Sequence, residues 1–246
     1  MELFENKETI QFVPVEYKDG IYSSTIRKAF KPSIDVNEYT EEVINWALKN
    51  HFKADGRTKV SIVRNATVGK FSEFALYKHF KSFGYNVSYP DLAVREKGQW
   101  DDGDLIIEGN KVSVKSSTFS KANLLMHKKG DWNSNGEYKY GKEGYDSSYK
   151  AFFFCRLNQD LKKIITDEFF NTASESDLID HLQSTNFMMD CPGFITVHDF
   201  RLLETNNMTI REGQIVDGLN VNKNTYYCQA GQLRDLSSIK RKKNAV

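Results

Sequence analysis

An aspartate, a serine and a lysine lie on two short neighbouring segments near the middle of the chain. Asp104 begins the first segment, a turn follows at Gly109-Asn110, and the second segment carries Ser113 and Lys115. Side chains alternate between the faces of a strand, so a β-hairpin would point Ser113 and Lys115 to one side, with Asp104 beside them. One carboxylate and one amine at a sheet end are groups that can hold a divalent cation and an attacking water for phosphodiester hydrolysis. Magnesium needs only one or two protein carboxylates, so this sparse acidic set is sufficient.

The elements that would position this hairpin follow an α/β pattern. Apolar residues at helical spacing predict helices over 36–52 and 67–83, upstream of hairpin strands at 104–108 and 111–115. A continuous apolar run over 151–156 is typical of a strand that is buried on both faces at the centre of a sheet. Because helices and strands alternate, we expect an α/β fold with a mixed central β-sheet flanked by helices.

The remaining segments give weaker signals. They predict a short helix over 120–127, a surface helix with a capping-box-like start over 174–182, and strands over 86–89, 194–200 and 226–229. No internal repeat or long low-complexity linker divides the chain. We therefore expect residues 1–246 to form a single domain.

The polar segment 128–149 is the longest stretch without a regular pattern, and loops of this length are uncommon unless functional. Amide side chains pair with adenine, lysine reaches guanine acceptors, and glycines allow close backbone approach to a DNA groove. The segment is therefore a candidate for base recognition in double-stranded DNA. The candidate contact residues are Lys128, Asn133, Asn135, Tyr138, Lys139 and Tyr140.

Charge is clustered along the chain although the net charge is only +1. Residues 111–150 hold eight lysines against four acidic residues, a balance of +4, whereas residues 160–190 have a balance of −5 from seven acids and two lysines. A nucleic-acid partner would have to use such a local basic region. The three cysteines fit neither a disulfide framework nor zinc spacing, no apolar run is long enough for a membrane span, and no secretory signal is evident. We therefore expect a cytoplasmic protein without membrane contact.

The hairpin resembles the PD-(D/E)XK nuclease motif, in which an Asp opens one strand and an acidic-x-Lys triplet lies on the next. Here Ser113 stands at the acidic position of the triplet, so one carboxylate of the motif is missing. Asp91, in the literal Pro90-Asp91 pair, is a rival for the motif aspartate. It ranks below Asp104 because Pro90 would end a strand, whereas Asp104 opens one.

The resemblance implies that the missing carboxylate comes from another helix, as it does in some members of the family. Glu73 is the candidate, because the segment 68–76 resembles the helix that precedes the hairpin in these nucleases and carries an inward glutamate. A carboxylate beside an apolar face needs a partner, and a metal is one. The implied magnesium ligands are Asp104, Glu73 and the Val114 carbonyl, with Lys115 acting on the water.

The resemblance covers roughly residues 66–160, with an N-terminal helical part over 1–65 and a C-terminal part over 161–246 as appendages. The order of elements downstream of Lys115 is similar to that of type II restriction enzymes. This implies magnesium-dependent hydrolysis of double-stranded DNA at a specific sequence by a homodimer of a restriction-modification system, leaving 5′ phosphates and 3′ hydroxyls. The alternatives are a structure-specific repair or junction-resolving nuclease of the same fold, and a DNA-binding module that has lost catalysis, as Ser113 would allow.

Overall fold

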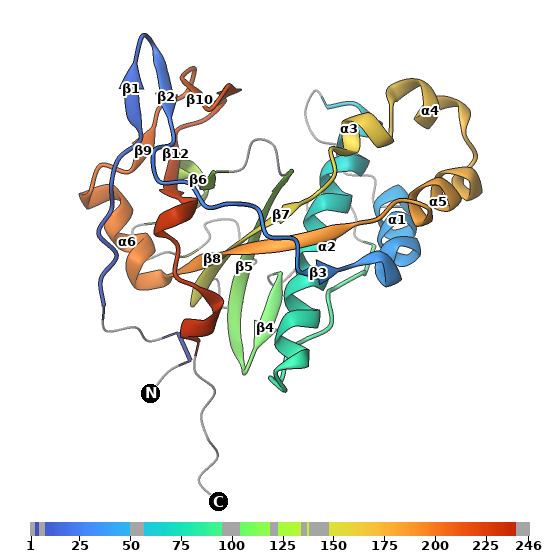
Figure 1. The fold of residues 1–246 in the computed structure, drawn as a ribbon, viewed down its shortest axis with the longest axis horizontal. Helices are drawn as coiled ribbons and strands as arrows, with labels where there is room; N and C mark the ends of the chain where they lie inside the picture. Colours follow the sequence, from blue (N-terminus) through green and yellow to red (C-terminus); the bar gives the residue numbers. More distant parts are fainter. Residues whose placement is uncertain are drawn as a thin grey trace, which may run out of the picture.

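The computed structural model describes residues 3–4, 8–49, 57–94, 104–118, 123–133, 137 and 148–239 of the chain. Its centre is a five-stranded mixed sheet with the order β3-β8-β7-β5-β4, in which only β5 and β7 are parallel (Figure 1). The strands are β3 (Ile34–Asp35), β4 (Leu105–Ile107), β5 (Asn110–Thr118), β7 (Ala151–Leu157) and β8 (Met188–Thr196). The expected α/β class with a mixed sheet is confirmed.

The strand β7 occupies the middle of this sheet and is buried along its whole length, as its unbroken apolar run predicts. Alternation sends its phenylalanines to two different interiors. Phe153 packs with helices on one face, in the helix-side core, whereas Phe152 and Phe154 pack on the other face, in the sheet-side core. The two cores place the central sheet between two layers.

The helix-side core lies beneath α2 (Lys59–Ser82), with α1 (Thr40–Lys49) and α5 (Glu175–Gln183) beside it (Figure 1). The helix α2 begins earlier than the expected 67–83, because the side chain of Thr58 caps its first turn by accepting from Ser61 N at 3.3 Å. The expected helix over 36–52 begins with a 3-10 turn at Asn37–Tyr39 and continues as α1. Two short helices, α3 (Leu161–Ile164) and α4 (Asp167–Thr172), connect β7 to α5.

The sheet-side core lies beneath a second, three-stranded sheet and the helix α6 (Val197–Thr205). Its strands are β6 (Leu124–Lys128), β12 (Thr225–Gln229) and β9 (Thr209–Ile210). The prediction of a helix over 120–127 is wrong, because residues 124–128 pair with β12 along their whole length. The strand predicted over 194–200 ends at Thr196, whose side chain caps α6 in a capping box with Asp199. The strand predicted over 226–229 is confirmed as β12.

The terminal parts of the chain are built into these layers. The segment 1–65 contributes β3 to the central sheet and a hairpin, β1 (Glu16–Lys18) with β2 (Ile21–Ser23), to a small sheet with β10 (Ile215–Val216) and β11 (Leu219–Asn220). The segment 161–246 contributes β8 and β12. The packed core therefore extends beyond residues 66–160 in both directions, and the N-terminal part contains strands as well as α1.

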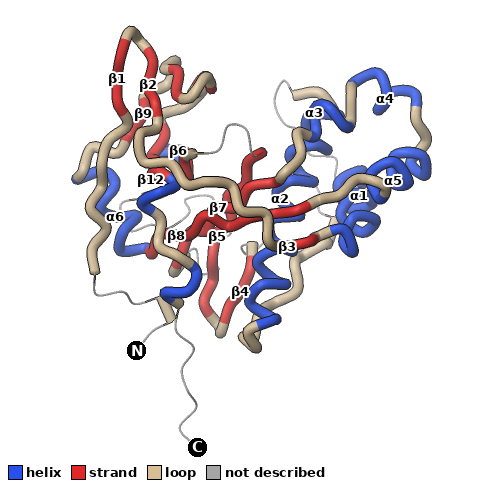
Figure 2. The backbone as a smooth tube through the Cα atoms, in the orientation of Figure 1, coloured by secondary structure: helices blue, strands red, loops and turns tan. Residues whose placement is uncertain are grey.

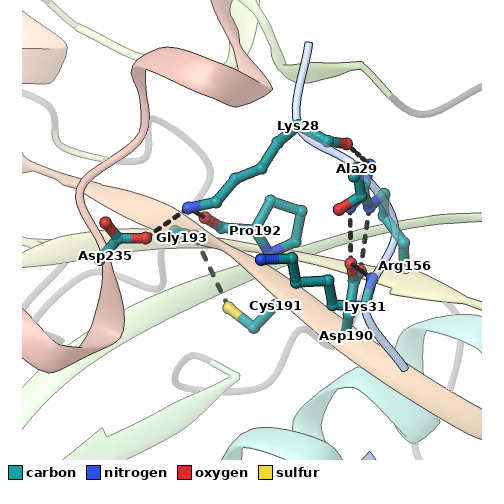
Figure 3. Close-up of polar contacts among 9 residues, drawn as sticks. All are labelled: Lys28, Ala29, Lys31, Arg156, Asp190, Cys191, Pro192, Gly193 and Asp235. Atoms are coloured by element: carbon teal, nitrogen blue, oxygen red, sulfur yellow. Dashed lines mark hydrogen bonds and ion pairs between the residues drawn. The ribbon is translucent and has the colours of Figure 1, made fainter. Parts of the chain in front are cut away.

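A buried ion pair fastens the N-terminal segment across the central sheet. The loop between β2 and β3 runs over β7 and β8 (Figure 2), and its backbone meets Arg156 and Asp190 (Figure 3). The Arg156 guanidinium donates to Asp190 at 2.9 Å and to the carbonyls of Lys28 at 2.9 Å and Ala29 at 3.0 Å, while Lys31 N donates to Asp190 at 3.0 Å. Only 2% of Arg156 is exposed, so these acceptors offset the cost of burying its charge.

Candidate active site at the β4–β5 hairpin

The hairpin β4–β5 is set by a two-residue turn. Leu105 pairs with Val112 and Ile107 with Asn110, so the turn residues are Glu108 and Gly109 and not the expected Gly109-Asn110. Both have positive φ, 48° and 76°, which is the type I′ geometry that matches the twist of paired strands. Continuing this register beyond Leu105 brings Asp104 opposite Ser113.

The Asp104 carboxylate is held by the second strand of the hairpin. Its Oδ2 accepts from Ser113 Oγ at 3.2 Å and from the backbone N–H of Val114. Among the described residues, the other oxygen, Oδ1, has no hydrogen-bond partner. Ser113 is buried and its hydroxyl donates to Asp104, so this serine orients the aspartate and adds no second negative charge. The structure thus brings together three of the residues proposed from the sequence, Asp104, Ser113 and Val114.

Ser113 and Lys115 lie on the same face of the central sheet. In the parallel pairing of β5 with β7, Ser113 is opposite Phe152 and Lys115 is opposite Phe154, and both phenylalanines belong to the sheet-side core. Lys115 is partly buried. Within the described part of the chain, its ammonium has no carboxylate within ion-pair distance. It is therefore a cation near Asp104 that is available for a further partner.

Glu73 approaches from the other layer. It lies on α2, which packs in the helix-side core, and its carboxylate forms an ion pair with Lys70 at 2.7 Å. Lys70 also donates to the Asp91 carbonyl at 2.9 Å and lies 4.6 Å from the Trp46 ring centroid. Only 2% of the Lys70 side chain and 9% of the Glu73 side chain are exposed, so the ion pair is shielded from solvent. Sequence reasoning missed Lys70, although its spacing of three residues from Glu73 is typical of a helical ion pair.

The rival aspartate, Asp91, lies on a segment that runs along the free edge of β4. Val87 bridges to Ile107, and Ser88 N donates to Ile106 O at 2.9 Å, so this segment is antiparallel to β4. Followed toward Asp91, it runs in the direction of Asp104. The side chain of Asp91 accepts from Ala93 N at 2.8 Å in a local turn. The two candidate aspartates therefore lie toward one end of the sheet.

Two of the proposed DNA contacts fall on described residues. Lys128 ends β6 and is exposed, whereas the Asn133 amide donates to the Glu137 carboxylate at 2.6 Å and its oxygen accepts from Glu137 N at 3.0 Å. The start of the polar segment is anchored by Trp132, which is buried in the sheet-side core. Outside the described residues lie Asn135, Tyr138, Lys139 and Tyr140.

His127, on β6, is a feature that sequence reasoning missed, since an isolated histidine is usually exposed or hydrogen-bonded. Its imidazole is 2% exposed and meets the rings of Phe152, Trp132 and Phe200 edge-on at centroid distances of 4.9, 5.3 and 5.3 Å. Neither ring nitrogen has a hydrogen-bond partner among the described residues. Burial, and next the positive charge of Lys115, hold the pKa of His127 well below its usual range.

A magnesium ion fits this donor set only in a sparse form. Among the described residues, no group of three or more His, Cys, Asp or Glu side chains is arranged to hold a metal. Asp104 nevertheless offers an oxygen, Oδ1, that has no partner in the part of the chain that the structure describes, and magnesium commonly uses one or two carboxylates with water and substrate phosphate. Glu73 pairs with Lys70 through Oε2 and lies on α2, in the layer on the opposite face of the sheet from Ser113 and Lys115.

In comparisons with protein-family models, curated proteins and solved structures, the chain gave no match. No helix of the described segments is both long and apolar enough to cross a bilayer.

Proposed function

We propose that the chain is a magnesium-dependent DNA endonuclease of the PD-(D/E)XK kind, and within that group a type II restriction enzyme. The observation that carries the proposal is the hairpin itself. Asp104 is fixed by Ser113 and Val114 at a strand end, and Lys115, which has no ion-pair partner in the described segments, lies two residues beyond Ser113 on the same face. A carboxylate and an amine so placed are the minimum set for metal-assisted hydrolysis of a phosphodiester.

The residues of the chain would divide the reaction between them. When bound, magnesium would supply Lewis-acid polarisation of the scissile phosphate. Asp104 would hold the ion through Oδ1, because Oδ2 is occupied by Ser113 and Val114. Glu73, whose Oε2 is paired with Lys70, would add a second carboxylate, and the resemblance adds the Val114 carbonyl. The Lys115 Nζ would orient the attacking water or take its proton, so the reaction needs no covalent intermediate.

Sequence specificity and double-strand cleavage require more than this hairpin. We propose that the segment 128–149 reads bases in a groove and that Lys128 contacts phosphate, because positively charged contacts give affinity while base edges give specificity. A homodimer would present two hairpins to the two strands of a palindromic site. The products would carry 5′ phosphates and 3′ hydroxyls.

A DNA-binding module without catalysis is the second candidate, and one observation favours it. The acidic position of the triplet is Ser113, and the carboxylate that would replace it, Glu73, is already paired with Lys70. If that pair persists in the complex with DNA, Lys70 already neutralises the charge of the Glu73 carboxylate, which weakens it as a metal ligand.

A plasmid digest with and without magnesium tests the proposal and its alternatives. A fixed band pattern that requires magnesium, with 5′ phosphates at the sequenced ends, supports a restriction enzyme. Smearing, or cutting of branched DNA alone, supports a repair or junction-resolving nuclease, and retention of DNA without cutting supports the binding module.

Two variants locate the site within the same digest. Asp104→Ala and Lys115→Ala should each lower cleavage by roughly 100-fold or more, since each removes a group at the reaction centre, while Lys115→Ala should still bind DNA. Lys111→Ala is the matched control, because Lys111 lies on the same strand and face as Lys115. If a folded Asp104→Ala variant cuts DNA at near the wild-type rate, Asp91 becomes the candidate for the motif aspartate.

A further inference from the structure

The buried imidazole of His127 makes no hydrogen bond within the described residues that would offset the cost of its burial. A polar ring in an apolar interior loses its hydrogen bonds to water, and this cost is recovered only if the protein supplies partners. Neither nitrogen of His127 has such a partner among the described residues, although the ring is nearly fully buried. A phenylalanine would fill the same aromatic surroundings without that cost. An unsatisfied buried polar group needs an explanation, and a role in function is one.

Of the hairpin residues proposed for the site, Ser113 and Lys115 lie on the face of the central sheet that meets the layer containing this ring. His127 packs edge-on against Phe152, and Phe152 is the register partner of Ser113 on the parallel strand. Lys115 follows on the same face, opposite Phe154. Burial, and next the positive charge of Lys115, lower the pKa of His127. The ring is neutral there, and a neutral imidazole always has one nitrogen that accepts a hydrogen bond. The lysine has donors and no carboxylate partner within the described residues.

We propose that His127 is a positioning residue for Lys115: its unprotonated ring nitrogen accepts a hydrogen bond from a water molecule that also accepts one from the Lys115 ammonium, and this bridge holds the ammonium at the Asp104 end of the hairpin. A carboxylate in this place would pair with the ammonium too strongly and would compete with the phosphate. A neutral acceptor orients the lysine without cancelling its charge. The catalytic consequence rests on the proposed nuclease function, whereas the contact between the two side chains does not.

The first test separates function from stability by removing two buried polar groups in turn. His127→Phe should raise Tm by roughly 2–4 °C, because an unsatisfied group is lost. It should lower the single-turnover cleavage rate by about 10- to 100-fold, as the loss of an orienting partner typically does. DNA affinity measured in calcium should not change. Thr67→Val is the matched control, since Thr67 is fully buried and its hydroxyl has no partner in the described residues either. It should raise Tm without changing cleavage.

Conservative variants identify a positional role. His127→Asn places an amide near the position of Nδ1 and His127→Gln near that of Nε2, so one of the two should recover part of the rate that phenylalanine loses. A rate for His127→Phe equal to that of the wild type would overturn the inference. So would equal losses in all three variants with weaker DNA binding, since that result indicates damage to the fold.

A second measurement does not depend on activity or on the variants of His127. In protein labelled with ¹⁵N-histidine, Lys115→Met should move the chemical shift of one ring nitrogen of His127 and leave those of His181, on α5, unchanged. An unchanged His127 spectrum would refute the contact. If the wild-type protein cuts no DNA but the shift occurs, the proposed function fails and the contact between His127 and Lys115 stands.

Discussion

Replacing Ser113 with aspartate would place an acid at the position where the PD-(D/E)XK motif has one. It would also make any effect of magnesium on the thermal stability of the fold measurable. The Ser113 hydroxyl lies 3.2 Å from Asp104 Oδ2, so the new carboxylate would lie against an existing one. Two like charges about 4 Å apart repel by about 4 kcal/mol at an effective dielectric constant near 20. Asp104 is only partly buried, which lowers the cost to roughly 2–4 kcal/mol.

Thermal unfolding in a chelator and in magnesium is the assay. In a chelator Ser113→Asp should lower Tm by roughly 5–15 °C, and magnesium should restore most of this loss because it neutralises both carboxylates. The loss of stability caused by Ser113→Asp should also disappear in acid. Sharing a site raises the folded-state pKa of the carboxyls above the unfolded value, so stability falls as pH rises through the carboxyl range and returns as pH falls below it.

Ser113→Asn is the matched control, since it has the size of aspartate without the charge. Its Tm should be the same in chelator and in magnesium. The reasoning is refuted if Ser113→Asp and Ser113→Asn are equally stable in chelator and neither responds to magnesium, because the Asp104 carboxylate would then not form a cation site with position 113.

Three further expectations concern other parts of the molecule. Arg156→Met should destabilise the fold by about 3–5 kcal/mol in urea unfolding, because Asp190 would be left as a buried charge without its partner. Acid unfolding should be less steep in His127→Phe than in the wild type: the unfolded chain takes up a proton below about 6.5 and the folded imidazole does not, so wild-type stability falls as pH falls through that range. In binding assays at two salt concentrations, Lys128→Ala should weaken binding to all DNA sequences equally and should reduce the slope of log affinity against log salt by about one unit. Asn133→Ala should instead lower the binding free energy for the cognate site alone, by about 1–3 kcal/mol. Equal losses on cognate and scrambled duplexes would remove Asn133 from base recognition.

The elements predicted well from the sequence are those whose signal is local. The run over 151–156 has no polar break before Arg156, and only the centre of a sheet buries such a strand on both faces. The hairpin follows from alternation around a glycine-containing turn, with an error of one residue in the turn itself. The helix α5 follows from its capping box of Ser174 with Asp177, which the structure contains in full.

The elements missed are those decided by partners far along the chain. The segment 124–128 is short, with three apolar residues followed by His127 and Lys128. Such a segment has no periodicity that separates a helix turn from a strand. Its strand form depends on pairing with β12, which lies near the other end of the sequence. The same second layer buries His127 and Trp132, so a segment that reads as the start of a polar loop is core at its first residues. Local patterns do not contain this information.

The pairing of Glu73 shows the same limit at the level of the site. The spacing of Lys70 and Glu73 is visible in the sequence, and on an exposed helix such a pair contributes only a few tenths of a kcal/mol. Here α2 is covered by α1 and the sheet, so both charges are buried, and removing either partner leaves an uncompensated ion. Because the ion pair is buried, Lys70 would compete strongly with a metal ion for the Glu73 carboxylate. The partner of Glu73 is therefore set by the tertiary packing of α2, and not by the local motif that first drew attention to Glu73.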